Sequence, residues 1–233
     1  MTAPALQFEQ HGYDDLRSLM TLMTGDEKHS SSATSTLDVL WTLYDSVLRY
    51  RADEPDWPAR DRFFLSKGHG PMAYYAVLAA KGFFPSDLLE DFGSFDSILG
   101  YHPDGKLIPG VEISSGSLGH GLPMALGAAA GLGMTGNLGS RVFVLIGDAE
   151  LDEGSNHEAI AVAPALRLAN LTAIVIDNQS ATHGWPGGIA GRFEVAGWSA
   201  TVVDGRDHDQ IERALSRPRS DVPHVVVAEV ESK

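Results

Sequence analysis

Two oxygen-bearing side chains follow two apolar runs of this sequence at the same spacing. Asp148 lies two residues after the run 141–146, and Asn178 lies two residues after the run 171–176. The thirty residues between the two side chains match the length of one strand–helix–strand unit. A carboxylate and an amide suit Mg²⁺ or Ca²⁺, which leave coordination positions for phosphate oxygens. The spacing therefore predicts a cation and phosphate site at the carboxyl ends of two strands, with turn-capping side chains as the alternative.

Several other kinds of site lack the residues they need. The chain has no cysteine, which excludes disulfides, zinc–thiolate sites and thiol catalysis. It contains no GxxxxGK[ST] and no GxSxG, and no GxGxxG follows a strand-like run. These absences argue against a P-loop, a hydrolase nucleophile elbow and a dinucleotide-binding turn.

The overall charge and the N-terminal residues limit the kinds of binding partner and the cellular location that we expect for the chain. A net charge of −14 disfavours nucleic acid and anionic membranes, although metal ions and backbone N–H groups still bind phosphate in an acidic protein. The first residues lack the basic start and apolar run of a signal peptide. Together with the lack of cysteine, this predicts a cytoplasmic protein that does not enter a membrane.

The two apolar runs also predict the architecture that positions the site. Neither run alternates between apolar and polar residues, which is typical of central parallel strands covered on both faces. We expect one α/β domain over residues 1–233 with a doubly covered, mainly parallel sheet and a loose lead-in at 1–12. Further strands are expected at 63–65, 201–203 and 224–230. Helices are expected at 14–23, 36–50, 71–81, 86–92, 122–133, 154–169 and 208–216.

Two glycine-bearing turns are candidates to complete the site. The turn SKGHG at 66–70 is expected to present Ser66, Lys67 and His69 together at a helix N-terminus, where anions are favoured. The turn GSLG at 116–119 opens a small-residue helix, which suits a diphosphate or a ring pressed against the backbone. A surface lysine and a tight helix–sheet contact are the structural alternatives. His29, in the Ser/Thr-rich turn 25–36, is by itself typical of a solvated loop.

Four segments of the chain resemble segments of the N-terminal half of transketolases, in the same order. They are DRFFLSKGH at 61–69, HPD at 102–104 with PGVEISSGSLGHG at 109–121, GDAELDEGSNHEA at 147–159 and NLTAIVIDNQ at 170–179. The Gly-Asp pair at 147–148, thirty residues before Asn178, resembles the diphosphate and metal motif of thiamine diphosphate enzymes. The resemblance runs from about residue 14 to 204 and implies the thiamine-diphosphate-binding fold.

The resemblance implies thiamine diphosphate with Mg²⁺, or Ca²⁺, as cofactors and assigns residues to them. The implied metal ligands are Asp148, Asn178 and the backbone carbonyl of Ser180. The implied diphosphate-lining residues are Gly147, Ala149 and Glu150, and those at the pyrimidine are Gly116, Ser117 and Leu118. Glu153 matches an acidic position of the cofactor site at the subunit interface. The implied active-site histidines are His29, His69 and His102.

The sequence also departs from the transketolase pattern. The family's glycine after the motif aspartate is Ala149 here, His120 stands where glutamine is frequent, and the turn after His29 has lost its Pro and Gly residues. The family's pyrimidine domain, which supplies the glutamate that activates the cofactor, is missing from this sequence. The resemblance therefore implies a split transketolase with a separate C-terminal, pyrimidine-domain subunit, expected as an α₂β₂ heterotetramer and inactive as a single chain.

The expected activity is transfer of a two-carbon ketol unit from a ketose, a sugar or sugar phosphate, to an acceptor. Three histidines suit this chemistry because imidazole exchanges protons near neutral pH. One alternative is a subunit that passes a two-carbon acyl unit to a lipoyl or carrier-protein thiol, as pyruvate dehydrogenase does. A second alternative is a non-catalytic partner subunit that keeps only the fold.

Overall fold

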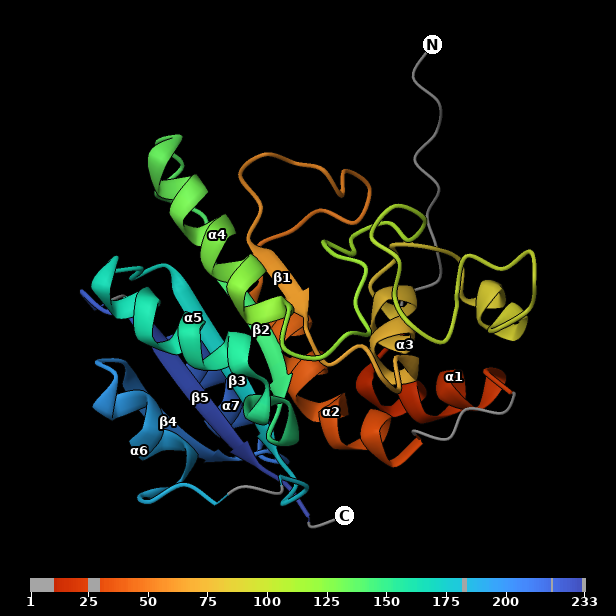
Figure 1. Cartoon of the computed structure of the whole chain (residues 1–233). Helices are drawn as coiled ribbons and strands as arrows, with labels where there is room; N and C mark the ends of the chain where they lie inside the picture. The colour runs from red at the N-terminus through yellow and green to blue at the C-terminus, as the bar shows by residue number, and fades with distance from the viewer. Residues whose placement is uncertain (1–10, 25–29, 182–183, 219, 232–233) are drawn as a thin grey trace.

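The fold is a parallel sheet with helices on both faces (Figure 1). The computed structural model describes residues 11–24, 30–181, 184–218 and 220–231. Five strands lie in the order β1-β2-β3-β5-β4, and each neighbouring pair is parallel. The strands are β1 Arg62–Leu65, β2 Val142–Gly147, β3 Leu171–Asp177, β4 Ser199–Asp204 and β5 His224–Glu229. The predicted α/β fold class is confirmed.

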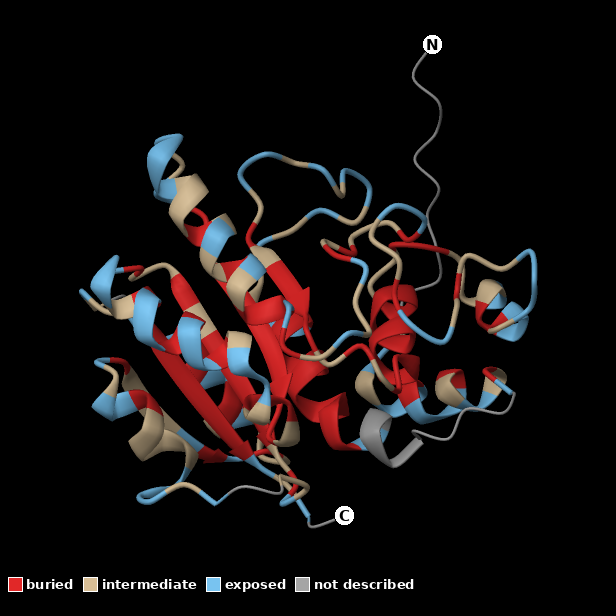
Figure 2. Ribbon diagram, in the orientation of Figure 1, coloured by how far each residue is buried: buried red, intermediate tan, exposed pale blue. Residues whose placement is uncertain are grey.

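The helices form two layers that bury both faces of the central strands. On one side lie α1 (Leu16–Leu22), α2 (Ser30–Thr42), α3 (Met72–Ala80) and α7 (His208–Leu215). On the other lie α4 (Gly121–Met134), α5 (Gly154–Ala165) and α6 (Gly188–Val195). Along β2, Phe143 and Leu145 join the first core, whereas Val142, Val144 and Ile146 join the second. Figure 2 shows the resulting buried sheet, which explains the unbroken apolar runs.

The crossover helix α5 ends at Ala165 instead of the expected residue 169, just before Arg167 takes the left-handed conformation with φ of 50°, and it contains Pro164 in its last turn. A proline has no N–H to donate to the carbonyl four residues back, which is that of Ile160. The indole of Trp198 donates to this carbonyl instead, at 2.8 Å. The proline is therefore accommodated by a hydrogen bond from the segment that enters β4.

Other helices differ from the expectation in their type and extent. The helix expected at 36–50 is α2 followed by a π-helical turn, η2, at Leu43–Val47. The helix expected at 86–92 is the 3₁₀ segment η3, Ser86–Asp91, and Tyr13–Asp15 form the 3₁₀ turn η1. Helix α6 was not predicted because its N-terminal half is rich in glycine, which has low helix propensity. Its Phe193 is fully buried against Trp198, with ring centroids 5.1 Å apart.

The register of the strands brings their carboxyl ends to one edge. Leu65 pairs with Leu145, and Gly147 pairs with Ile176. The turn after β1, the 3₁₀ turn η4 (Ala149–Asp152) after β2, and the loop after β3 therefore leave the sheet side by side. Among the described residues, no helix has both the length and the apolar character that a membrane crossing requires.

Candidate functional site

The loop after β3 folds back over the carboxylate of Asp148, whose residue is only 2% exposed. Ser180 donates its backbone N–H to Oδ2 and its hydroxyl to Oδ1, both at 2.6 Å. The backbone N–H of Ala181 donates to Oδ2 at 3.0 Å. Gln179 takes the left-handed conformation, with φ of 57°, and so reverses the chain toward Asp148. The ends of β2 and β3 are therefore joined through this one carboxylate.

Asn178 presents an unsatisfied oxygen at the same edge. The residue is 6% exposed, and its Oδ1 has no hydrogen-bond partner among the described residues. A buried polar atom without a partner costs about 1–3 kcal/mol, so native proteins seldom keep one without a ligand or water. An amide oxygen is a ligand that Mg²⁺ and Ca²⁺ accept. The donor set of Asp148 and Asn178 thus fits the implied cation.

This donor set is typical of a site for a hard cation that few side chains hold. No group of three or more His, Asp or Glu side chains that would hold a metal alone occurs among the described residues. A cation bound by one carboxylate and one amide keeps several positions for backbone carbonyls, water and phosphate oxygens. The assignment of the Ser180 carbonyl as a third ligand stays a prediction.

The glycine turn before α4 packs so closely that side chains are excluded. Gly116 has φ of 146°, and a Cβ there would lie 2.7 Å from Cδ2 of His102. Gly119 has φ of 85°, and a Cβ there would lie 2.6 Å from the Cβ of Glu153. Ser117 is exposed and Leu118 is half-buried. The turn therefore exposes backbone atoms at the carboxyl edge of the sheet. This would allow the close approach of the cofactor ring or diphosphate that the resemblance implies.

Glu150, on η4, turns its carboxylate inward instead of toward the edge. The residue is 1% exposed, and its carboxylate accepts hydrogen bonds from the hydroxyl of Ser66 and the N–H groups of Gly119 and Gly147. Burial raises the pKa of this carboxyl above its ordinary value, and the hydrogen bond from Ser66 opposes that shift. A contact of Glu150 with a diphosphate would therefore involve its backbone and not its carboxylate, and the diphosphate contacts of Glu150 and of the half-buried Ala149 stay predictions.

Two of the three predicted histidines meet at this edge. The rings of His69, from the turn after β1, and His102 lie edge to face with centroids 4.9 Å apart. His69 is half-buried and His102 is exposed. His29 lies outside the described residues. Glu153 is exposed on the segment that starts α5, beside the glycine turn.

Sequence reasoning missed that two serines hold the glycine turn, because it assigned Ser66 to an anion site and gave Ser155 no role. Ser66 is 1% exposed and its Oγ accepts a hydrogen bond from the N–H of Gly121 at 2.9 Å. Ser155 donates to the carbonyl of Gly119 at 2.6 Å. Both serines lie inside motifs that carry the resemblance, but their partners are 55 and 36 residues away, and sequence spacing gives no signal for such contacts.

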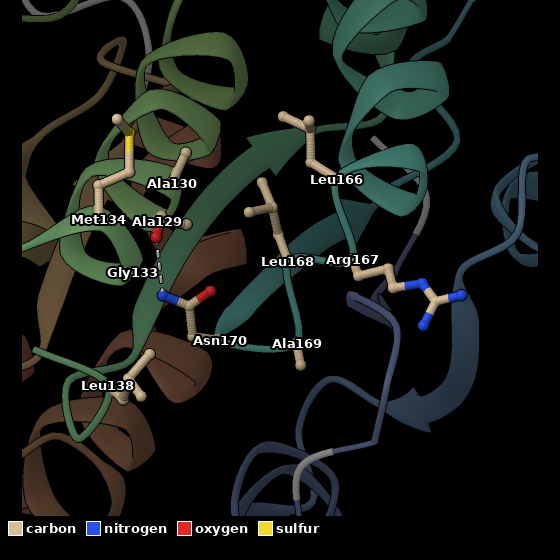
Figure 3. A pocket seen from close by; sticks show the side chains of 10 residues that line it. All are labelled: Ala129, Ala130, Gly133, Met134, Leu138, Leu166, Arg167, Leu168, Ala169 and Asn170. Atoms are coloured by element: carbon tan, nitrogen blue, oxygen red, sulfur yellow. Dashed lines mark hydrogen bonds between the residues drawn. The ribbon is translucent and has the colours of Figure 1, made fainter. Parts of the chain in front are cut away.

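A hollow of the described part of the chain lies away from this edge (Figure 3). It has a volume of about 490 Å³ and lies between the C-terminal ends of α4 and α5, where Asn170 donates to the carbonyl of Ala129 at 3.0 Å. Its other lining residues are Ala130, Gly133, Met134, Leu138, Leu166, Arg167, Leu168 and Ala169. This mainly apolar lining contains one side-chain amide, that of Asn170, and no carboxylate, so it does not suit a cation and phosphate site.

Nearly the whole chain matches one known family. Residues 16–230 match the family described as transketolase, thiamine diphosphate binding domain. The structure is similar to that of transketolase from Campylobacter jejuni, with a TM-score of 0.76 and 25% sequence identity. The match covers 94% of this chain and 38% of that enzyme, so this chain spans little more than a third of its length.

Two curated relatives are closer to this chain in length. One is named as a subunit of the apulose-4-phosphate transketolase of Phocaeicola vulgatus, and it is 35% identical over 80% of this chain and 68% of its own. A Rhodococcoides fascians protein named ferredoxin fas2 is 53% identical, over 98% of this chain and 78% of its own. The present chain has no cysteine and so has no ligands for a cysteine-bound iron–sulfur cluster.

Proposed function

The chain belongs to the transketolase family through its thiamine diphosphate-binding domain, and we propose that it is the cofactor-binding subunit of a two-chain transketolase. Its reaction is transfer of a two-carbon ketol unit from a ketose donor to an acceptor. The Phocaeicola vulgatus relative, which this chain matches over 68% of its length, is named as one subunit of a transketolase and so supports a division of the enzyme between chains.

The unsatisfied Oδ1 of Asn178, beside the buried Asp148, is the observation that carries this proposal. The two side chains end neighbouring parallel strands, where α/β proteins bind phosphorylated ligands. We infer that both bind a divalent cation, Mg²⁺ or Ca²⁺, which in turn holds the diphosphate. Gly147 and Ala149 approach the diphosphate through their backbone, and Gly116, Ser117 and Leu118 approach the pyrimidine.

When bound, thiamine diphosphate supplies the carbon nucleophile and the electron sink needed to break a ketose carbon–carbon bond. The protein has to orient the donor sugar and to move protons on its hydroxyl groups. The ring nitrogens of His69 and His102 are suited to this role, because the rings lie together and imidazole titrates near neutral pH. The same role for His29 rests on the sequence resemblance.

We further infer that the site is completed by a second chain, which carries the pyrimidine-binding domain. Exposed Glu153 lies beside the glycine turn, where it is available to that chain. An α₂β₂ assembly is the arrangement we expect, because the family resemblance places the cofactor between subunits. The single chain should then bind thiamine diphosphate weakly and catalyse no transfer.

The test is to titrate thiamine diphosphate and Mg²⁺ into this chain, into its partner and into their mixture, and to assay each with a ketose phosphate and an aldose. Tight binding and ketol transfer only in the mixture are the expected results. A mixture that binds no thiamine diphosphate contradicts the proposal. If the mixture transfers an acyl group to a lipoylated carrier, acyl transfer replaces ketol transfer as the reaction. If it reduces an artificial electron acceptor, an assay that the ferredoxin name of the 53% identical relative suggests, a redox reaction replaces it.

A further inference from the structure

The carboxylate of Glu150 receives three hydrogen bonds from three separate parts of the chain. Its Oε1 accepts from the hydroxyl of Ser66 and from the N–H of Gly119, the latter at 2.8 Å. Its Oε2 accepts from the N–H of Gly147 at 3.3 Å. The turn after β1, the glycine turn before α4 and the end of β2 therefore meet at one buried side chain.

Ser66 extends this contact to a second amide of the glycine turn. Its hydroxyl donates to Glu150 and accepts from the N–H of Gly121 at 2.9 Å. A Cβ on Gly121 would overlap the side chain of Ser66, so the turn rests directly on this serine. The backbone N–H groups of Gly119 and Gly121 thus both donate hydrogen bonds to the pair formed by Ser66 and Glu150.

Only a carboxylate satisfies all three donors around Glu150. An ionised carboxylate is an acceptor at both oxygens, whereas a glutamine offers one acceptor oxygen and one NH₂ group. In the variant Glu150→Gln, the NH₂ group would face either Gly147 N–H or the pair formed by Ser66 and Gly119. Burial of a carboxylate costs free energy unless hydrogen-bond donors surround it, and the donors around Glu150 come from three segments, which fits a role in holding these segments together.

We propose that Glu150 is a positioning residue, which fixes the backbone of the glycine turn 116–121 in the shape that receives the cofactor. This inference rests on the proposed function and adds a role for a side chain that the family resemblance places only along the diphosphate. Glu150 acts through Ser66, Gly119 and Gly147, and its carboxylate is buried among these three hydrogen-bond donors.

The test compares Glu150→Gln with Glu158→Gln, which removes the same charge from an exposed position of α5. Amide hydrogen exchange is measured by NMR in the chain without cofactor, and the dissociation constant of thiamine diphosphate with Mg²⁺ is measured in the two-chain enzyme. E150Q should accelerate exchange at the turn amides about 10-fold or more, and should weaken cofactor affinity by about 10–100-fold, as loss of a supporting hydrogen-bond partner does in metal sites. E158Q should change neither.

A loss of cofactor affinity without a loss of kcat distinguishes a positioning role of Glu150 from general damage to the fold. At saturating cofactor, E150Q should retain kcat within about threefold, because the histidines and the cation ligands are unchanged. Ser66→Ala provides a second variant should E150Q fail to fold. It should accelerate exchange mainly at Gly121, whose N–H loses its acceptor, and less at Gly119, whose N–H still reaches Glu150.

Two outcomes overturn different parts of the account. A wild-type enzyme that binds no thiamine diphosphate contradicts the proposed function, whatever the behaviour of Glu150. A wild-type enzyme that binds the cofactor, with E150Q equal to it in affinity and in turn exchange, overturns the positioning role alone.

Discussion

Ser180 holds Asp148 with two hydrogen bonds of 2.6 Å, one from its backbone N–H to Oδ2 and one from its hydroxyl to Oδ1. A third bond, from Ala181, also ends on Oδ2. A carboxylate has about four acceptor positions, so one position on Oδ1 stays available for a cation. The loop after β3 therefore fixes the orientation of the carboxylate without occupying it fully, which is the preorganisation a metal ligand needs.

Replacement of Asn178 should affect cation binding and leave the folded chain nearly unchanged. Because Oδ1 of Asn178 has no partner among the described residues, N178A should change the free energy of unfolding of the cofactor-free chain by about 1 kcal/mol or less. Mg²⁺-dependent binding of thiamine diphosphate should be lost. Urea unfolding and calorimetric titration measure the two effects.

Asn156 is the matched control, since it is a second buried asparagine whose Oδ1 has no partner among the described residues. Its Nδ2 donates to the carbonyl of Glu150 at 2.7 Å, so N156A should destabilise the chain by about 1–3 kcal/mol. Equal destabilisation by N178A and N156A, with cation binding intact in N178A, would show that Asn178 is a structural residue.

Gly116→Ala should displace His102 and impair catalysis more than folding. The added Cβ would lie 2.7 Å from Cδ2 of His102, at a backbone φ of 146° that strains other residues. We expect kcat/KM of the two-chain enzyme to fall about 100-fold, as ångström-scale misplacement of a reacting group does, with a loss of stability of about 1–3 kcal/mol. Steady-state kinetics and thermal unfolding are the measurements.

Gly127→Ala serves as the control for the glycine substitution. A Cβ at Gly127, inside α4, meets no atom within 4 Å, so G127A should raise stability by about 0.5–1 kcal/mol and leave kinetics unchanged. If G116A matched G127A in kcat/KM, the close contact between the glycine turn and His102 would have no catalytic role.

His224 should make the chain less stable in mild acid. Burial, followed by the charge of Arg217, lowers the pKa of His224 to about 4 from an ordinary value of 6.5. Between pH 6.5 and about 4 the unfolded chain therefore binds a proton that the folded chain does not, and stability falls as pH falls. From pH 7 to pH 5 the loss should be about 2 kcal/mol, as measured by urea unfolding.

The contribution of His224 is isolated by the variant His224→Asn, which stays neutral at both pH values. Its stability should fall less between pH 7 and pH 5 than that of the wild type, by the same amount of about 2 kcal/mol. If stability fell equally between pH 7 and pH 5 in the two proteins, the fall would not come from a lowered pKa of His224, because the other histidines are common to both.

The sequence predicts the strands and the edge at which they end, because a strand that is buried on both faces is an unbroken run of apolar residues in the sequence. The apolar runs around Phe143 and Ile174 have no alternation, and the spacing from Asp148 to Asn178 follows from one crossover. Contacts that join distant segments leave no such pattern. Ser66 and Glu150 are 84 residues apart, and Trp198 compensates Pro164 from another element, so only the folded chain reveals them.

The proposed function requires that Asp148 anchor thiamine diphosphate through a divalent cation. Calorimetric titration of thiamine diphosphate into the two-chain enzyme, with and without Mg²⁺, tests it directly. D148A should abolish binding, and Asp209→Asn, an exposed substitution on α7, should leave it unchanged. Saturable, Mg²⁺-dependent binding is expected in the wild type and in D209N alone. Undiminished binding by D148A, or binding that is independent of the cation, would contradict it.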